Sequence, residues 1–348
     1  MRRRRLAGGT VLAAFAASLT VLTGTGTAHA DSSTVLPVSS HWQTVADSTH
    51  HHVYISAPGS DAVVATDFDG QVIKTIGQLD GARGMALSRD ENTLYVALPE
   101  ADAIAAVDTS TLEETRRFAT GDGTAPESLA LAGDKLWFSY RASWSGAIGS
   151  ISVGDPEPVV DPGNVPDFTW YGKPLLASSP ASPDLLVAGE SEVSPGALRV
   201  YDVTSGQTQE IAYNENPGGT VEDLAVTPDG QSVVTAADSV YYHQQFRLSD
   251  LTQTGQYDTG PYPTAVAIAP DGTVAAGIVA GGDSDIYVYP PGSTIPARTV
   301  VLGSSSDRDL LRRGLAWASD GSRLFAVRFT YQAQVILDVV PMTDGVSR

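Results

Sequence analysis

Seven short β-rich runs recur along the chain at nearly equal spacing, and each is preceded by a turn that contains an aspartate. The first run is VYIS at residue 53 and the last is LFAV at residue 324. The turn aspartates are Asp47, Asp90, Asp134, Asp184, Asp229, Asp271 and Asp320. Neighbouring aspartates are 42 to 50 residues apart. Self-similarity at a period of this size indicates a repeat architecture.

Each unit contains more than the recurring run. Before the turns, segments such as GMALS and DLAVT carry a central alanine, which we expect to face a shared axis where strands crowd together. These alanines are Ala86, Ala130, Ala225, Ala267 and Ala316. After each run, segments such as AVVATDFDGQVIKTI show two strands joined by a turn, and in three units that turn begins at Asp67, Asp108 or Asp202. Each unit therefore has four strands.

Seven units of four strands predict an all-β chain that folds as a seven-bladed β-propeller of four-stranded antiparallel blades. Outside the first thirty residues, no segment shows helical spacing of apolar residues over ten or more positions. Blades cannot bury their faces separately, so we assign residues 31–348 to one domain. The expected blades are approximately 41–80, 81–123, 124–166, 167–218, 219–260, 261–307 and 308–342. The last unit has three clear strands, and we predict that STVLPV at 33–38 supplies the fourth and closes the ring.

The first thirty residues have the pattern of a secretory signal peptide. Arg2 to Arg5 form a positive region, an apolar segment runs to about Leu22, and Ala28-His29-Ala30 is typical of a cleavage site. The apolar segment is too short and too interrupted to span a membrane. We expect residues 1–30 to be removed and the remaining 318 residues to be secreted, without a membrane span; the Sec and twin-arginine routes both stay open.

Charge and cysteine content limit the classes of partner. The chain has 21 basic and 40 acidic residues, a formal net charge of −19. Loss of four arginines with the leader would leave 17 basic residues and a net charge of −23. Such a surface repels phosphate backbones, so we expect no nucleic-acid partner. The chain has no cysteine, so it is disulfide-free and must be stabilised by burial alone, and we expect a monomer.

Residues 81–123 carry a family resemblance. The segment GARGMALSRDENTLYVALPEADAIAAVDTSTLEETRRFATGDG resembles a YVTN-type repeat, as found in WD40-like seven-bladed propellers of secreted and surface bacterial proteins. The resemblance covers nearly all of the predicted mature chain but is specific only to architecture. Members are often binding or surface modules, whereas some related propellers are lyases or lactonases. It also implies that loops B–C and D–A lie on one face, where ligands bind, and that the A–B turns lie on the other.

The position seven residues before each turn aspartate falls, on this geometry, at the mouth of the central channel. Blade 4 contains a small insertion, and there we align Lys173 by eye. The seven residues are Ser40, Arg83, Glu127, Lys173, Glu222, Thr264 and Arg313. One interpretation is a ring of ion pairs and hydrogen bonds between blades. The other is a site for a zwitterionic or anionic small ligand, because convergent charges in a concavity are typical of binding sites.

Aromatic residues in the predicted loops of the same face are further candidates for ligand contact. Trp144, with Tyr140 and Arg141, lies in the B–C loop of blade 3, and Trp170 and Tyr171 precede blade 4. The next B–C loops add acids and aromatics: Glu190, Glu192, Tyr241, Tyr242 and His243. Such side chains could stack on sugar rings or on a peptide. Packing of loops between blades is the alternative explanation.

Metal sites receive little support from the sequence. An EF-hand loop is absent, and we expect no cofactor; calcium held by aspartates on one face is the alternative. His50, His51 and His52 are adjacent, but the repeat places them in and just after an A–B turn. Alternation along the strand that begins at His52 would point His51 and His52 to opposite sides. We therefore predict no metal site there.

No motif for catalysis occurs in the chain. H-E-x-x-H, G-x-S-x-G and the phosphate-binding loops are all missing, and we assign no catalytic residue. The leading hypothesis is a secreted non-catalytic module that binds an extracellular small molecule, glycan or protein at the channel mouth. The alternative is an extracellular hydrolase or lyase that uses carboxylates there, so whether the protein is an enzyme stays open.

Overall fold

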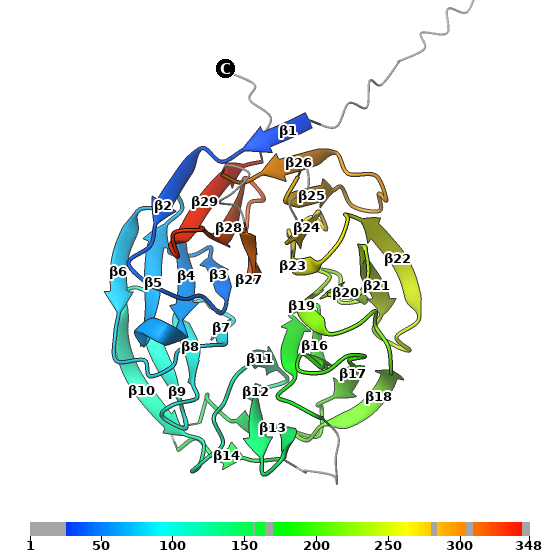
Figure 1. Cartoon of the computed structure of the whole chain (residues 1–348). Helices are drawn as coiled ribbons and strands as arrows, with labels where there is room; N and C mark the ends of the chain where they lie inside the picture. Colours follow the sequence, from blue (N-terminus) through cyan, green and yellow to red (C-terminus); the bar gives the residue numbers. More distant parts are fainter. Residues whose placement is uncertain (1–25, 156, 164–169, 280–283, 304–308, 343–348) are drawn as a thin grey trace, which may run out of the picture.

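A computed structural model describes residues 26–155, 157–163, 170–279, 284–303 and 309–342. The described strands form seven sheets arranged as blades of a ring, each with four antiparallel strands, which confirms the predicted all-β seven-bladed propeller (Figure 1). Within the described ranges, the one helical segment is the 3-10 turn Pro58–Ser60. None of the described helices is long and apolar enough to cross a membrane.

Each blade runs from an inner strand A to an outer strand D. Blade 1 comprises β3 (Thr44–Asp47), β4 (His52–Ala57), β5 (Ala62–Asp67) and β6 (Val72–Ile76). Blade 2 comprises β7 (Met85–Leu87), β8 (Thr93–Leu98), β9 (Ala103–Asp108) and β10 (Glu113–Ala119). Blade 3 comprises β11 (Leu129–Ala132), β12 (Lys135–Ala142), β13 (Ser145–Ile151) and β14 (Val160–Asp161).

The other blades repeat this order. Blade 4 comprises β15 (Leu175–Ser179), β16 (Ser182–Gly189), β17 (Leu198–Asp202) and β18 (Gln209–Asn214). Blade 5 comprises β19 (Val221–Val226), β20 (Ser232–Ala237), β21 (Tyr242–Arg247) and β22 (Gln253–Asp258). Blade 6 comprises β23 (Pro263–Ile268), β24 (Val274–Ile278), β25 (Ile286–Tyr289) and β26 (Arg298–Val301), and blade 7 contains β27 (Asp309–Trp317), β28 (Arg323–Phe329) and β29 (Val335–Pro341).

An N-terminal strand closes the ring, as the sequence predicted. β2 (Ser32–Val35) pairs antiparallel with β29, Ser32 opposite Val339 and Val35 opposite Ile336. Main-chain hydrogen bonds continue the ladder at both ends, from Asp31 to Val339 and from Leu36 to Val335, each 2.9 Å long. The first and last parts of the propeller are therefore tied together in one blade (Figure 1).

A further strand lies within the predicted leader. β1 (Gly26–His29) pairs in parallel with β26 and makes blade 6 five-stranded (Figure 1). Cleavage after Ala30 would remove this strand and leave blade 6 with four strands, the number in every other blade.

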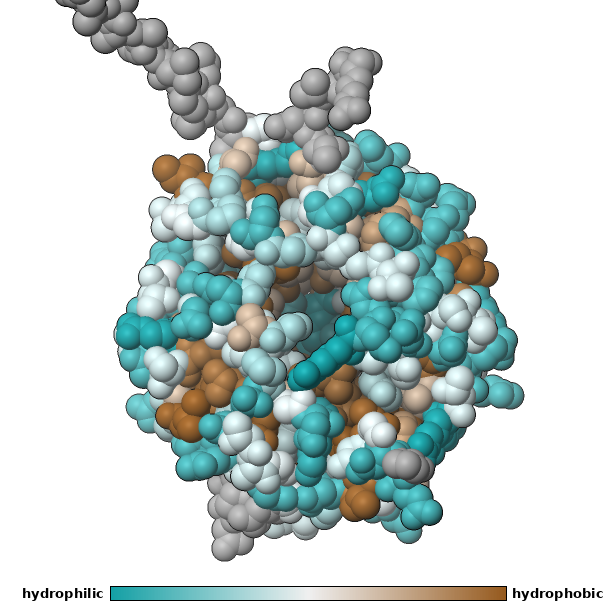
Figure 2. All heavy atoms as spheres, turned by 180° about the vertical axis from the view of Figure 1, so that it is seen from behind, coloured by the Kyte–Doolittle hydropathy of each residue, from teal (hydrophilic) through white to brown (hydrophobic). Residues whose placement is uncertain are grey.

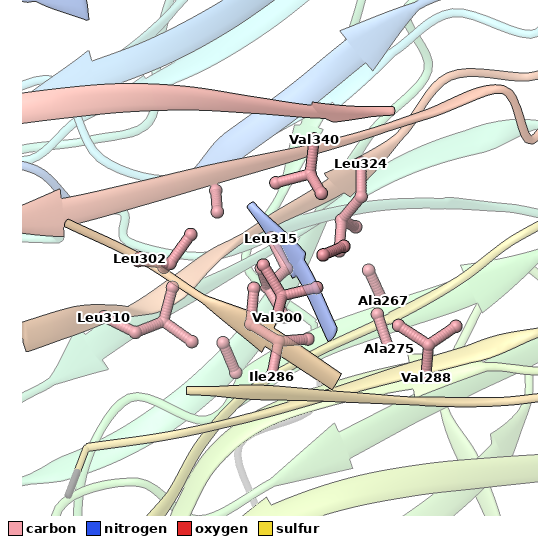
Figure 3. Packing of buried hydrophobic residues seen from close by; sticks show 13 residues of the cluster. Ala267, Ala275, Ile286, Val288, Val300, Leu302, Leu310, Leu315, Leu324 and Val340 are labelled. Carbon is pink, nitrogen blue, oxygen red and sulfur yellow. The ribbon is translucent and has the colours of Figure 1, made fainter. Parts of the chain in front are cut away.

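In the described part of the chain the hydrophobic core consists of seven clusters, and each is built mainly from two neighbouring blades. The cluster between blades 6 and 7 joins Ile286 and Val300 to Leu315, Leu324 and Val340 (Figure 3). Because each blade buries apolar side chains on both faces, removing one blade would expose two clusters. This is the physical reason why the repeat folds as a ring and not as separate units.

Aspartate-led turns join the inner strands as predicted, with one exception. In blades 5, 6 and 7 the turn is Asp-Gly, and Gly230, Gly272 and Gly321 take positive φ, as this turn requires. The exception is blade 4, where Asp184 lies inside β16 and the turn falls at Pro180–Ala181. The prediction for Asp184 was wrong because the insertion in this blade shifts the strand by several residues.

Candidate ligand site at the channel mouth

The residues predicted to surround the channel mouth lie just before strand A or within it. Arg83, Glu127 and Lys173 stand two residues before β7, β11 and β15. In an antiparallel blade, the start of A, the end of B, the start of C and the end of D share one edge. The D–A and B–C loops therefore gather on one face, which we call the mouth face. The face with the A–B and C–D turns is called the turn face.

One carboxylate links three blades on the mouth face. Glu127 Oε2 lies 2.5 Å from Arg83 Nη1 and also forms an ion pair with Lys173 Nζ. Glu127 and Lys173 are buried, whereas Arg83 is partly exposed. Lys173 Nζ also donates to the main-chain oxygen of Ala125, at 3.3 Å. The inter-blade ion pairs that the sequence suggested are therefore present here.

A second group of charges joins blades 5 and 7. Glu222, at the start of β19, forms an ion pair with Arg312, whose side chain is 61% exposed. Arg313 donates to two main-chain oxygens, Trp42 at 3.0 Å and Glu222 at 3.1 Å. Sequence reasoning chose Arg313 and missed Arg312; the adjacent arginines in the sequence were the available signal.

Asp223 completes this group. It is buried, and its two carboxylate oxygens accept hydrogen bonds from the main-chain N–H groups of Leu224 and Val266, both at 2.9 Å. Burial raises the pKa of Asp223 to about 7, against the effect of these hydrogen bonds and of Arg313. We call seven side chains the mouth cluster: Arg83, Glu127, Lys173, Glu222, Asp223, Arg312 and Arg313.

Burial also shifts the pKa values of other titratable groups at the mouth. Burial raises the pKa of Glu222, and Arg312 opposes that shift. Burial also lowers the pKa of Arg313, against the attraction of Asp223 and other acids. His41, beside the mouth, has its pKa lowered to about 3 by burial and by Arg313, so it is neutral at pH 7.

Trp42 reaches from blade 1 to the core shared by blades 4 and 5. It precedes strand A of blade 1, yet its side chain joins the core cluster of blades 4 and 5 that contains Leu175 and Leu224. The Arg313 guanidinium lies over the Trp42 ring, 4.1 Å from its centroid. A cation held on an aromatic face, with main-chain acceptors on either side, is strongly positioned. The sequence analysis did not identify Trp42.

A cavity of about 340 Å³ opens beside the mouth cluster, between blades 6 and 7. Its wall is apolar at Val279, Leu310, Leu311 and Phe329. The polar lining residues are His41, Thr264, Asp309, Arg312 and Arg313. A concave site with an apolar wall and a few polar groups has the composition of a small-molecule pocket.

A second cavity lies along the central channel. This cavity of about 460 Å³ is lined by the inner strands of blades 2 to 5, including Ala86, Ala130, Ala177 and Ala225. Figure 2, which views the ring from behind, shows the central hollow. Three of the alanines expected to face the axis therefore line this channel.

Exposed tryptophan and tyrosine side chains concentrate on the mouth face. Among the described residues they are Trp144, Tyr171, Tyr213, Tyr241, Tyr262 and Tyr331. All but Tyr213, which lies on the outer strand β18, stand in B–C or D–A loops. Tyr262 and Tyr331 were not identified from the sequence, although the flanking prolines of Tyr262 mark a loop.

Other predicted aromatics occupy the interior. Trp170 is 2% exposed and packs in the cluster between blades 3 and 4, with Arg199 over its ring at 5.3 Å. Tyr140 is buried and donates to the Pro162 oxygen at 2.9 Å. His243 is buried as well, and burial lowers its pKa to about 4. These three side chains stabilise the fold and are not carried into the candidate site.

Glu190 and Glu192 hold the loop that leads to Lys173. Glu190 accepts main-chain hydrogen bonds from Tyr171 at 2.9 Å and Gly172 at 3.2 Å, and burial raises its pKa. Glu192 accepts the N–H of Lys173 at 3.2 Å and pairs with Arg141 at 3.4 Å. Both carboxylates therefore position Tyr171 and Lys173.

The three adjacent histidines lie where the repeat predicted, with His52 as the first residue of β4. The His51 ring lies apart from the other two and packs edge-on against Phe68 with centroids 5.2 Å apart, while His50 stacks on His52. His50 Nδ1 also lies 2.9 Å from Asp47 Oδ2. In the described part of the chain, no group of three or more His, Asp or Glu residues is placed to hold a metal ion.

Comparison with known proteins identifies the fold but no family. No protein-family model matches the chain, and no curated protein sequence matches it. The β-propeller domain of Myceliophteria thermophila Cps50 (Swd1) is 13% identical, with 89% of this chain and 98% of that chain covered and a TM-score of 0.67. Hydrazine synthase of Kuenenia stuttgartiensis is 16% identical over 90% and 98%, with a TM-score of 0.64.

A third similar structure comes from an assembly. A chain in the crystal structure of the Mitotic Checkpoint Complex is 15% identical, with 99% of this chain and all of that chain covered and a TM-score of 0.71. At these identities the similarity shows a WD40-like propeller fold and nothing finer.

Proposed function

We propose that this protein is a secreted, non-catalytic binding module whose ligand docks on the mouth face. The observation that carries the proposal is the concentration of exposed aromatic side chains and inter-blade charges on that one face. The exposed aromatic residues in the B–C and D–A loops of that face are Trp144, Tyr171, Tyr241, Tyr262 and Tyr331. Rigid aromatic side chains beside charged groups are typical of recognition surfaces.

The class of ligand is an extracellular small molecule, glycan or protein. The signal-peptide pattern of residues 1–30 supports export, and the resemblance to YVTN-type repeats supports a role outside the cell. WD40-like propellers serve as interaction scaffolds, and one structural neighbour belongs to a protein assembly. Binding through five loops on a rigid ring is compatible with each of these ligands.

A catalytic role is the second candidate, and Glu222 is the observation that favours it. Its carboxyl is 4% exposed, its pKa is raised by burial, and it lies at the mouth. A carboxyl in such a setting can act as a general acid. The Glu222→Gln variant separates the two functions: an enzyme loses turnover and keeps ligand binding, whereas a binding module has no turnover to lose.

The experiment for the proposed function is a thermal-shift screen of the protein against Ca²⁺, EDTA, oligosaccharides and peptides. A ligand that binds the native state raises the melting temperature. For each compound that does so, binding is measured by calorimetry with Trp144→Ala and Tyr262→Ala, and Tyr213→Ala on the outer strand serves as control. We expect affinity to fall about tenfold in one or both mouth-face variants.

Two results would contradict the proposal. One is a ligand whose affinity is unchanged in both mouth-face variants and lower in the control. The other is turnover that Glu222→Gln abolishes. Export is tested separately, because secreted protein that begins at Asp31 is the expected product of signal-peptide cleavage.

A further inference from the structure

The mouth cluster is cationic within a strongly acidic protein. Its seven side chains comprise four cations and three acids, while the whole chain has a net charge of −19. Arg83 and Lys173 share the single carboxylate of Glu127, and Asp223 is bound to main-chain N–H groups. Positive charge in a concavity of an acidic protein attracts anions locally.

Arg312 is the most accessible of these cations. Its side chain is 61% exposed, whereas its partner Glu222 is 4% exposed. The contact is made by Nε of Arg312, and Glu222 Oε2 has no hydrogen bond of good geometry. Among the described residues, no acceptor bonds to the two terminal nitrogens of Arg312. A guanidinium with two parallel donors at a cavity wall suits a carboxylate, which accepts both.

The cavity beside Arg312 limits the size of the ligand that this guanidinium can bind and the polarity of the rest of that ligand. Leu310, Leu311 and Phe329 provide an apolar wall, and Thr264 provides a hydroxyl. His41 is neutral there, and its Nε2 is bonded to Thr44 Oγ1 at 2.9 Å. A volume of about 340 Å³ accommodates a small organic molecule and not a polymer.

We propose that this cavity binds a small carboxylate with an apolar body, the carboxylate on Arg312 and the body against Leu310, Leu311 and Phe329. Asp309 lines the same cavity and places a negative charge at its rim. A second anionic group on the ligand is therefore disfavoured, whereas an ammonium group is accommodated. The inference rests on the proposed function only in placing the ligand on the mouth face.

The test uses phenylacetate as probe and calorimetry on the full-length chain. We expect saturable binding, at least about tenfold weaker binding of the neutral analogue phenylacetamide, and a similar loss of phenylacetate affinity in Arg312→Gln. Arg312→Lys keeps the charge without the two-pronged donor and should bind with intermediate affinity. Arg89→Gln, at an exposed arginine on the turn face, is the matched control and should bind as the parent does.

Several outcomes decide the proposal. Equal affinity for phenylacetate and phenylacetamide, or unchanged affinity in Arg312→Gln, overturns it, as does the absence of saturable binding. Circular dichroism checks that each variant is folded. Phenylalanine is a second probe, and it tests the role of Asp309. If phenylalanine binds more tightly than phenylacetate and Asp309→Asn weakens that binding, the carboxylate site has a neighbouring ammonium subsite. Failure here is distinct from failure of the proposed function, because loss of sugar or peptide binding in Trp144→Ala and Tyr262→Ala is measured independently.

Discussion

The pKa values of acidic side chains are shifted in opposite directions on the two faces of the ring. On the turn face, hydrogen bonds from the same turn lower the pKa of the carboxyls. Neighbouring hydroxyls and N–H groups are the main cause of the lowered pKa. The residues concerned are Asp90, Asp108, Asp202, Asp229, Asp250 and Asp320. On the mouth face, burial raises the pKa of Glu190, Glu222 and Asp223.

The two faces also differ in where the partners of a carboxylate lie in the chain. Asp108 Oδ1 accepts hydrogen bonds from Ser110 and Thr111, two and three residues away. Glu127 meets Arg83 and Lys173, each more than forty residues away and on another blade. A carboxylate on the turn face keeps its hydrogen bonds wherever its own turn forms. The Glu127 carboxylate has its ion-pair partners only when the ring is assembled. Groups with raised pKa in a concavity are the stronger candidates for function.

The largest expected effect is the removal of the carboxylate shared by three blades. Glu127→Gln leaves Lys173 buried and Arg83 half-buried without a counter-charge, so we expect a loss of about 3 kcal/mol in the free energy of unfolding. Urea unfolding measures it. The control is Glu210→Gln, which breaks the partly exposed pair with Arg199 between β18 and β17 of one blade and should cost below about 1 kcal/mol. Equal losses in the two variants would remove the distinction between mouth and surface pairs.

The next largest effect is a pH dependence of the free energy of unfolding that arises from Asp223. Its pKa is about 7 in the folded protein and 3.8 in an ordinary setting, so between these values the folded state holds a proton that the unfolded state has released. Stability from this group is therefore lost as pH rises toward 7. We expect the advantage of the parent over Asp223→Asn to shrink by about 2 kcal/mol between pH 5.5 and 7.

Comparison with the variant isolates Asp223 from the histidines. Burial lowers the pKa of His41 and His243 to about 3 and 4, so their contribution to stability is lost as pH falls below 6.5. Parent and Asp223→Asn share that loss, and it cancels in the difference between their urea midpoints. A difference that stays constant from pH 5.5 to 7 would show that Asp223 is ionised throughout.

The smallest effect is expected on the turn face. Asp229→Ala removes hydrogen bonds from Thr227 at 2.6 Å and from the Gln231 N–H at 3.0 Å, at an exposed turn. We expect a loss below about 1 kcal/mol in urea unfolding. Because the pKa of Asp229 is lowered, this contribution is present above pH 3.8 and is lost below it, the opposite sign to Asp223. A loss as large as that in Glu127→Gln would contradict the comparison.

Much of the ring could be predicted from the chain alone because its signals are local. Asp-Gly turns with positive-φ glycines, Asx-turns at Asp67 and Asp108, and small alanines on inner strands all depend on neighbouring residues. The fourth strand of blade 7 was predicted because one unit had a strand too few. Asp184 was misplaced where an insertion broke the spacing.

The candidate site was predicted in part, by position and not by contact. Counting back from the turns led to Glu127 and Glu222 at the mouth, and Lys173 was aligned by inspection because of the insertion in blade 4. It could not show that Trp42 reaches the core shared by blades 4 and 5 or that Arg312 is the exposed arginine. It also gave no sign that Trp170 is buried, because Trp170 and Tyr171 are adjacent in the sequence and only packing separates them.

The sequence by itself determined the number of blades, their strands and the turns between them, because these rest on short-range hydrogen bonds and a repeated pattern. The tertiary structure decided which charges meet, which aromatic side chains remain exposed and where Trp42 packs. Those outcomes depend on contacts between residues of different blades, and no periodic signal encodes the distance between two side chains on opposite sides of a ring.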